Sequence, residues 1–283
     1  MPSFRALFAE SKSAIPDMLF PLFQSDIHPH LQRDLITTLL NLCLHDDNCK
    51  KLIAEDGPMG ILVFPLVIDA LKSSILETRS NAAAALCLSS DLDLNKEFIG
   101  KLGALKPLID LFEEGQPLAT RNAASAIFNL CIVGNNKEKA LGLGVVKVLV
   151  KKIKNGMYVD ESVSILSLLS NLEMATNEMR KLGAVPYLFN IITERVSAVN
   201  NENSALIRES SSAVNAEKSA LKLDNCLFTL YNTIWCSNGR NYKEISDEEN
   251  SHKTFSRLAQ NWSPVAQKFA NTFLEILELG IPH

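Results

Sequence analysis

A segment of about 42 residues recurs along this chain of 283 residues, and that recurrence limits the possible folds more than any other feature. It is clear when PLATRNAASAIFNLC, residues 117–131, is compared with ILETRSNAAAALCLS, residues 75–89. We take Asn129 as the marker of the repeat, and the equivalent marker positions are 46, 42, 42, 61 and 44 residues apart: Asn41, Cys87, Asn129, Asn171, Asn232 and Ile276. A chain with such a period stacks similar units on one another instead of building one closed core.

Glycine marks a turn inside each unit. The turn glycines are separated by 46, 41 and 39 residues, and a leucine follows each of them five residues later: Gly57, Gly103, Gly144 and Gly183. Glycine adopts the left-handed conformation that joins two helices without steric cost. Each unit is therefore expected to contain a short helix, a glycine turn, a second helix and a longer third helix. Three helices in about 42 residues is the period of armadillo repeats.

The sequence predicts an all-α fold, an armadillo-repeat right-handed superhelix (α-solenoid) of about six three-helix repeats in a single domain, 1–283. The predicted repeats are 1–46, 47–91, 92–133, 134–174, 175–237 and 238–283. The long gap before Asn232 contains a polar stretch, and we expect a flexible insertion at about 194–221. Two interpretations of it stay open: a tolerated insertion, or a regulatory loop phosphorylated at Ser210, Ser211 or Ser212.

Several motifs resemble the armadillo region of plant U-box proteins, which are E3 ubiquitin ligases. They are KLGALKPL at 101–108, AIFNLCIVGNNK at 126–137 and LAQNWSPVAQKFANTFLEIL at 258–277, and the resemblance covers nearly the whole chain. In that family the armadillo array holds the substrate, and a separate U-box recruits a ubiquitin-charged E2 enzyme. No segment of this sequence resembles the opening of a U-box. The resemblance therefore implies substrate recognition in these residues and leaves enzymatic activity uncertain.

Composition narrows the partners and the location. With 28 basic and 32 acidic residues and a net charge of −4, the chain has no broad basic surface for nucleic acid. The most apolar stretch, residues 61–71, is far shorter than the roughly 20 residues of a membrane-spanning helix. The six cysteines form no C-x-x-C motif and mostly lie in apolar helical runs, as in proteins of reducing compartments. We expect a monomer in the cytoplasm, the nucleus or both.

The common catalytic and cofactor motifs do not occur. The sequence contains no H-E-x-x-H, no G-x-S-x-G and no G-x-x-x-x-G-K-[ST]. Gly142-Leu143-Gly144 is interpreted as a repeat turn, because neither a third glycine nor a preceding strand accompanies it. We predict no catalytic residue, no cofactor and no metal site.

The asparagines at the marker positions are the first candidate binding residues. Third helices line the inner groove of an armadillo superhelix, and a carboxamide offers both a hydrogen-bond donor and an acceptor. A row of them can hold the backbone of an extended peptide without selecting its side chains. The alternative is that they bond within or between helices. The candidates are Asn41, Asn129, Asn171 and Asn232.

Arginine stands eight residues before three of the marker positions, at Arg33, Arg79 and Arg121. Eight residues is about 80° around a helix, so these side chains would flank the groove. Guanidinium groups bind carboxylates and phosphates, which predicts a preference for an acidic or phosphorylated segment. The alternative is that they pair with carboxylates of their own chain.

We therefore predict a module that binds a partner or substrate protein in the groove, linked to ubiquitination as substrate recognition for a U-box type ligase. A signalling scaffold or adaptor without a ubiquitin role is the alternative. A nuclear-import adaptor is disfavoured, because the repeats of importin-α carry Trp four residues before the groove asparagine. The residues at those positions here are Thr37, Ala83, Ser125, Ser167 and Phe228.

Overall fold

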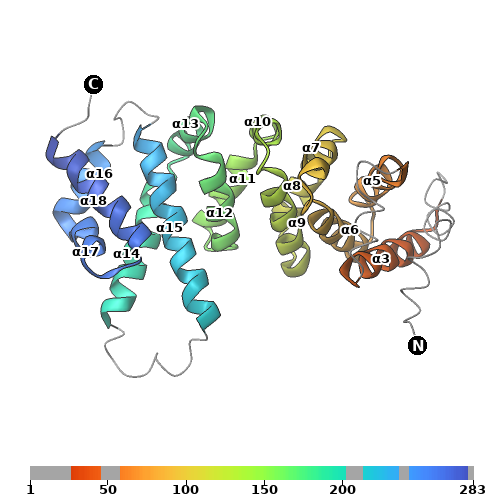
Figure 1. Cartoon of the computed structure of the whole chain (residues 1–283), viewed down its shortest axis with the longest axis horizontal. Helices are drawn as coiled ribbons and strands as arrows, with labels where there is room; N and C mark the ends of the chain where they lie inside the picture. The colour runs from red at the N-terminus through yellow and green to blue at the C-terminus, as the bar shows by residue number, and fades with distance from the viewer. Residues whose placement is uncertain (1–26, 46–57, 202–212, 236–241, 280–283) are drawn as a thin grey trace. The chain divides into compact units, whose positions relative to one another are not determined.

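The computed structural model describes residues 27–45, 58–201, 213–235 and 242–279 (Figure 1). Fifteen α-helices and no strands occur within these ranges, which confirms the all-α prediction. The helices gather into two compact units, Met1–Val145 and Val146–His283, which we name unit 1 and unit 2. The predicted repeat limits and the single domain stay predictions.

Unit 1 contains seven of the described helices. They are α3 (Pro29–His45), α5 (Pro58–Ala70), α6 (Leu76–Ser89), α7 (Asp93–Lys101), α8 (Leu105–Glu114), α9 (Pro117–Leu130) and α10 (Gly134–Gly142). The long helices pack in succession, α3 against α6 and α6 against α9, while α8 covers α9. Helices α7, α8 and α9 thus follow the predicted order of a short, a second and a third helix.

Unit 2 contains the other eight described helices. They are α11 (Val145–Lys154), α12 (Val159–Leu169), α13 (Glu173–Lys181), α14 (Val185–Asn201), α15 (Ala213–Trp235), α16 (Tyr242–His252), α17 (Thr254–Asn261) and α18 (Pro264–Leu279). Here α12, α15 and α18 are the third helices, and α15 packs against both of the others. Helices α14 and α17 lie against α15 and α18.

The glycine turns form as predicted at three of the four positions. Gly103, Gly144 and Gly183 have φ angles of 90°, 78° and 63°, each directly before a second helix. A side chain with a Cβ is strained in this conformation, so glycine both ends the short helix and redirects the chain. Gly57 lies outside the described residues.

Small residues let the third helices of unit 1 approach one another closely. Helix α6 buries Ala82, Ala83 and Ala85, and α9 buries four alanines of its own. Large side chains fill the remaining space, including Phe64 and Phe112, which are at most 1 % exposed. Close packing of this kind gains dispersion energy and removes apolar surface from water.

Aromatic rings connect three helices in the core of unit 2. The rings of Phe255 and Phe273 stack with centroids 4.6 Å apart, and Phe189 of α14 meets Phe255 edge-on at 5.9 Å. Both Phe255 and Phe273 are 0 % exposed. These rings join α14, α17 and α18 into one cluster.

The insertion is more helical than the sequence predicted. Helix α14 continues to Asn201 and α15 begins at Ala213, so helix occupies both ends of the segment expected to be a flexible loop at 194–221. The reason is local propensity: AVNAEKSA at 213–220 combines good helix formers with three alanines. Residues 202–212, with the three candidate phosphorylation serines, lie outside the described residues.

Two of the six cysteines are confirmed as core residues. Cys131 in unit 1 and Cys226 in unit 2 are fully buried, and burial raises the pKa of each thiol to about 12. Cys87 is half-buried, and burial raises its pKa to about 11. The predictions for Cys43, Cys49 and Cys236 concern side chains outside the described set. None of the described helices is long and apolar enough to cross a membrane.

Candidate protein-binding faces

Each third helix presents one face that is exposed or half-buried, and its residues recur every three or four positions. The unit 1 face consists of Glu77, Asn81, Ala84 and Leu88 of α6 and of Leu118, Arg121, Ser125 and Asn129 of α9. The unit 2 face consists of Asp160, Ser164, Leu168 and Asn171 beside α12, of Leu221, Asn225, Phe228 and Asn232 of α15, and of Val265, Lys268, Thr272 and Glu275 of α18.

Two of the four marker asparagines tie a third helix to the preceding one. Asn129 donates from Nδ2 to the carbonyl oxygen of Cys87, at 3.3 Å. Asn232 donates from Nδ2 to the hydroxyl of Ser170, at 2.8 Å. Within the described residues the Oδ1 atoms of these two asparagines accept no hydrogen bond. Each half-exposed carboxamide therefore has a structural role and still presents an acceptor to solvent.

The other two marker asparagines are more exposed. Asn41 lies on the exposed side of α3, and Asn171 lies in the turn that follows α12. The four asparagines are thus divided between the two units, with Asn41 and Asn129 in unit 1 and Asn171 and Asn232 in unit 2. In each unit one marker asparagine is half-buried and bonded to the preceding third helix, and the other is exposed.

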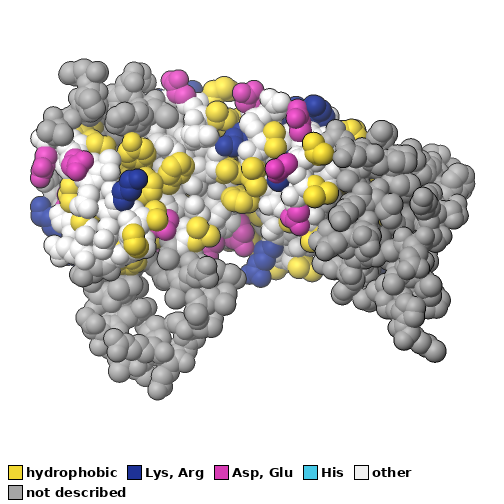
Figure 2. Space-filling view, in the orientation of Figure 1, with side chains coloured by type: hydrophobic (Ala, Val, Ile, Leu, Met, Phe, Trp, Pro, Cys, Tyr) yellow, Lys and Arg dark blue, Asp and Glu magenta, His cyan; other side chains and the backbone are white. Residues whose placement is uncertain are grey.

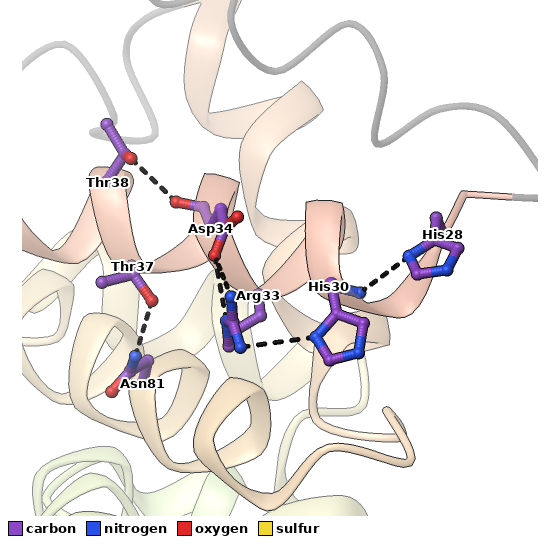
Figure 3. Close-up of polar contacts among 7 residues, drawn as sticks. All are labelled: His28, His30, Arg33, Asp34, Thr37, Thr38 and Asn81. Atoms are coloured by element: carbon purple, nitrogen blue, oxygen red, sulfur yellow. Dashed lines mark hydrogen bonds and ion pairs between the residues drawn. The ribbon is translucent and has the colours of Figure 1, made fainter.

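A second row of asparagines was missed from the sequence. Seven residues before the marker, Asn122 donates to the carbonyl and hydroxyl oxygens of Ser80 at 3.2 and 3.1 Å. Asn225 donates to the hydroxyl of Ser164 at 3.2 Å in the same way. The available signal was a polar residue two helical turns before Asn129 and Asn232 in otherwise apolar helices. Asn81 makes a related bond, 2.8 Å long, to the hydroxyl of Thr37 on α3 (Figure 3).

The structure shows specific partners for the candidate arginines Arg79 and Arg33. Arg79 of α6 forms an ion pair with Glu114 at the end of α8, and its side chain is 20 % exposed. Arg33 is bonded to the adjacent Asp34 at 2.7 Å, and its guanidinium faces His30 (Figure 3). The hydrogen bond to Asp34 raises the pKa of the Arg33 guanidinium above its ordinary value. Arg121 is exposed on the unit 1 face.

A buried asparagine fixes a short helix of unit 1 against the third helix before it. Asn136 of α10 is 0 % exposed and donates from Nδ2 to the carbonyls of Lys96 and Leu130, at 2.8 and 3.0 Å. Gly100 makes this approach possible, because a Cβ at that position would lie 1.9 Å from the Asn136 oxygen. This contact holds the C-terminal end of α9, where Asn129 lies, in a defined place.

The unit 2 face carries aromatic side chains at its centre. Phe228 of α15 is 37 % exposed, and its ring meets that of Phe269 on α18 edge-on at 5.9 Å. Tyr231 lies 5.8 Å from the same Phe269 ring. Leu221 and Val265 are 58 % and 47 % exposed. Hydrophobic side chains accordingly gather over α15 and α18 in Figure 2.

The described residues contain no group of three or more His, Cys, Asp or Glu side chains placed to hold a metal ion. The polar groups on both faces instead bond to helix backbones and to one another. Such an arrangement can bind another polypeptide through hydrogen bonds and apolar contact.

Comparison with known proteins agrees with this architecture. A family model described as Armadillo/beta-catenin-like repeat matches residues 93–132, which correspond to α7, α8 and α9. A designed armadillo repeat protein, YIII(Dq)4CqI, aligns with a TM-score of 0.66 at 18 % identity, over 93 % of this chain and 99 % of that protein. Another designed armadillo repeat protein, solved in complex with the peptide (KR)4, aligns with a TM-score of 0.63 at 17 % identity, over 94 % of this chain and all of the other. The prediction of an armadillo fold is confirmed.

Similar sequences are found among plant proteins. U-box domain-containing protein 9 of Arabidopsis thaliana is 43 % identical over 275 residues, which is 97 % of this chain and 54 % of the relative. Putative U-box domain-containing protein 46 of the same plant is 38 % identical over 279 residues, 97 % of this chain and 55 % of the relative. The chain thus spans about half the length of the curated relatives it matches.

Proposed function

We propose that this chain, an armadillo-repeat protein similar to the repeat region of plant U-box proteins, binds an extended segment of a partner or substrate protein along its third-helix faces. The observation that carries the proposal is the pair of half-exposed asparagines, Asn129 and Asn232. Each is held in place by a bond to the preceding helix, and each presents an acceptor with no partner among the described residues. A fixed acceptor at the repeat spacing suits the backbone N–H groups of an extended peptide.

Backbone contacts of this kind give little affinity by themselves. A hydrogen bond contributes about 0.5–1.5 kcal/mol net, because both groups give up water to form it. Several repeats acting on one segment are therefore required, and the side chains around the asparagines must supply specificity. This is the expected division of roles in an interaction module of stacked repeats.

For unit 1 we propose a preference for an acidic or phosphorylated segment near Arg79 and Arg121. Because Glu114 already pairs with Arg79, a partner carboxylate has to compete with it for the guanidinium. A phosphate competes better than a carboxylate, since it carries more charge and more acceptor oxygens. Arg33 is paired with Asp34 and would contribute less.

We further propose that the partner is a ubiquitin-pathway substrate, and that the chain acts as a monomer in the cytoplasm, the nucleus or both. The similarity to U-box domain-containing proteins supports this link. A signalling scaffold without a ubiquitin role is the second candidate, because the repeat region of such a protein binds partners by itself. The two differ in the fate of the partner: loss of this protein should raise the abundance of a ubiquitination substrate and leave that of a scaffold partner unchanged.

Selection from a library of random 16-residue peptides displayed on phage tests the binding function. We expect enriched peptides whose affinity falls about threefold to tenfold with Asn129→Ala or Asn232→Ala, the range of one or two lost hydrogen bonds. The matched control is Asn190→Ala, which removes an exposed asparagine of α14 outside both faces. Binding would be measured well below the melting temperature, with folding checked by circular dichroism. A library that yields no binder, or binders equally sensitive to Asn190→Ala, contradicts the proposal.

A further inference from the structure

Three exposed apolar side chains of the unit 2 face form one patch with the half-buried Phe269 beside them: Leu221, Phe228 and Val265. Leu221 and Phe228 lie two turns apart on α15, about 10 Å along the helix. The hydroxyl of Ser263 donates to the Asp224 carboxylate at 3.1 Å, and it also accepts from the backbone N–H of Ala266. These bonds hold the start of α18, and hence Val265, beside the part of α15 between Leu221 and Phe228.

The patch is not required by the packing of the repeat. The position equivalent to Phe228 in α9 is Ser125, which is exposed on the unit 1 face. The same architecture therefore tolerates a small polar side chain where unit 2 has an aromatic ring. A ring that is 37 % exposed, beside aliphatic side chains that are 58 % and 47 % exposed, leaves apolar surface in water that a partner can cover.

One positive charge borders the patch and has no counterion in the part of the chain that the structure describes. Lys268 lies one turn after Val265 on α18, is exposed, and forms no ion pair within the described residues. Two other described charged groups near the patch are engaged: Lys222 pairs with Asp160 at 2.7 Å, and Asp224 accepts from Ser263. Glu275 lies two turns beyond Lys268 on the same helix.

We infer that this patch binds a bulky apolar side chain of the partner segment, aromatic or leucine-like, whose neighbouring carboxylate meets Lys268. The inference rests on the proposed function and names the chemistry of its partner at unit 2. Aromatic and aliphatic anchors that fill such sites carry most of the energy of an interface. The carboxylate adds orientation and charge complementarity, and little affinity, because the pair stays near solvent.

The peptides selected from the phage library also test this inference. We expect enrichment of Phe, Trp or Leu within two residues of Asp or Glu.

For the best peptide, fluorescence anisotropy should give an affinity about tenfold lower with Phe228→Ala, the scale of a truncated anchor contact. Because Phe228 also packs on Phe269, Leu221→Glu serves as a second variant, and its side chain is exposed enough to be replaced without loss of core packing. Lys268→Glu should lower affinity about threefold, and should raise affinity for the same peptide with Lys in place of its acidic residue.

The controls are Leu94→Glu and Lys147→Glu, which change exposed side chains of the same types outside the patch. Less than a twofold effect of both controls, together with the losses above, supports the inference. Peptides that respond to Asn129→Ala or Asn232→Ala but not to Phe228→Ala, Leu221→Glu or Lys268→Glu overturn it and leave the proposed function standing. Selection of no peptide at all contradicts the proposed function, and the inference with it.

Discussion

Units 1 and 2 are built by the same repeat and share carboxamide bonds between third helices, yet the other contacts between their helices and the side chains on their exposed faces differ. In unit 1 carboxamides and an ion pair join successive helices, through Asn136, Asn122 and the Arg79–Glu114 pair. In unit 2 the carboxamide bonds of Asn225 and Asn232 are accompanied by a cluster of rings, with Phe255 and Phe273 at its centre. The repeat therefore specifies where helices go and leaves open which chemistry joins them.

The same difference reaches the faces proposed to bind a partner. Ser125 and Arg121 give the middle of α9 a polar surface, whereas Phe228 gives the middle of α15 an aromatic one. A segment bound to the unit 1 face would need polar or acidic residues, and a segment bound to the unit 2 face would need an apolar anchor. Substitutions in each unit test whether these different interactions also contribute differently to the free energy of unfolding and to peptide affinity.

The buried thiols give each unit its own reporter. Only the thiolate reacts readily with iodoacetamide, and burial raises the pKa of Cys131 and Cys226 to about 12. In the folded protein at pH 8 both should stay unmodified, and each should react once its own unit opens. Mass spectrometry of alkylated peptides across a urea series then reads unit 1 and unit 2 separately.

The largest effect is expected from Phe255→Ala in unit 2. The side chain is 0 % exposed and contacts the rings of Phe189 and Phe273, so its removal leaves a cavity in the ring cluster. The free energy of unfolding should fall by about 3–5 kcal/mol. Cys226 should become reactive at a lower urea concentration than Cys131. Phe255→Leu, which keeps most of the volume, should lose much less, and equal exposure of both cysteines would show that the units do not differ in this way.

The next effect concerns Asn136 in unit 1. Asn136→Ala removes two hydrogen bonds to backbone carbonyls, of which that of Leu130 also accepts from the Val133 N–H, so we expect a loss of about 1–3 kcal/mol in urea unfolding. Gly100→Ala should cost a similar amount, because its Cβ would collide with the Asn136 side chain.

A double-mutant cycle separates the contact between position 100 and Asn136 from other destabilising effects of the two substitutions. If the collision with Asn136 is the cause, Gly100→Ala should be nearly neutral when Asn136 is already alanine. Additive losses would mean that Gly100 matters for another reason, and that the polar contact of unit 1 is weaker than its geometry indicates. Cys131 should report the opening in both single variants.

A smaller effect is expected at the ion pair of the unit 1 face. Glu114→Gln removes the counterion of Arg79 and keeps the size of the side chain. Exposed pairs contribute about 0–1 kcal/mol, so stability should change little. At low salt the variant should bind an acidic peptide about twofold to threefold more tightly than the original protein does. At high salt this difference should disappear, because the charges are screened. Glu138→Gln, at an exposed position of α10, is the control, and an equal gain there would assign the effect to net charge.

Much of the fold could be predicted from the sequence because the repeat imposes it. The positive φ angles at Gly103, Gly144 and Gly183 follow from a spacing that only a turn between helices explains. The inter-helix bonds of Asn129 and Asn232 were one of two open alternatives, since a carboxamide at that position can serve a neighbour, a ligand or both.

The remaining features of the fold and of the candidate site depend on contacts between residues that are distant in the sequence, and the repeat period does not specify these contacts. That Arg79 pairs with Glu114, 35 residues away, is decided by how α6 packs beside α8. The exposure of Phe228 depends on how α18 covers α15, and the sequence alone placed Phe228 only as a position lacking Trp. The helical ends of the insertion were missed because polar composition outweighed alanine content in the prediction.

The smallest expected change is a gain in stability, at Thr120 in α9. Its side chain is 0 % exposed, and the Oγ1 atom has no hydrogen-bond partner among the described residues, as is also true of Thr78 at the equivalent position in α6. Thr120→Val keeps the shape and removes a buried hydroxyl that lost its water on folding, so stability should stay level or rise by about 0.5–1 kcal/mol. Thr120→Ser, which keeps the hydroxyl and loses a methyl group, should lower it. Cys131 alkylation would show whether Thr120→Val instead destabilises unit 1. That result would mean that the Thr120 hydroxyl makes a stabilising hydrogen bond in solution, and that buried polar groups contribute more to the stability of this unit than its known hydrogen bonds indicate.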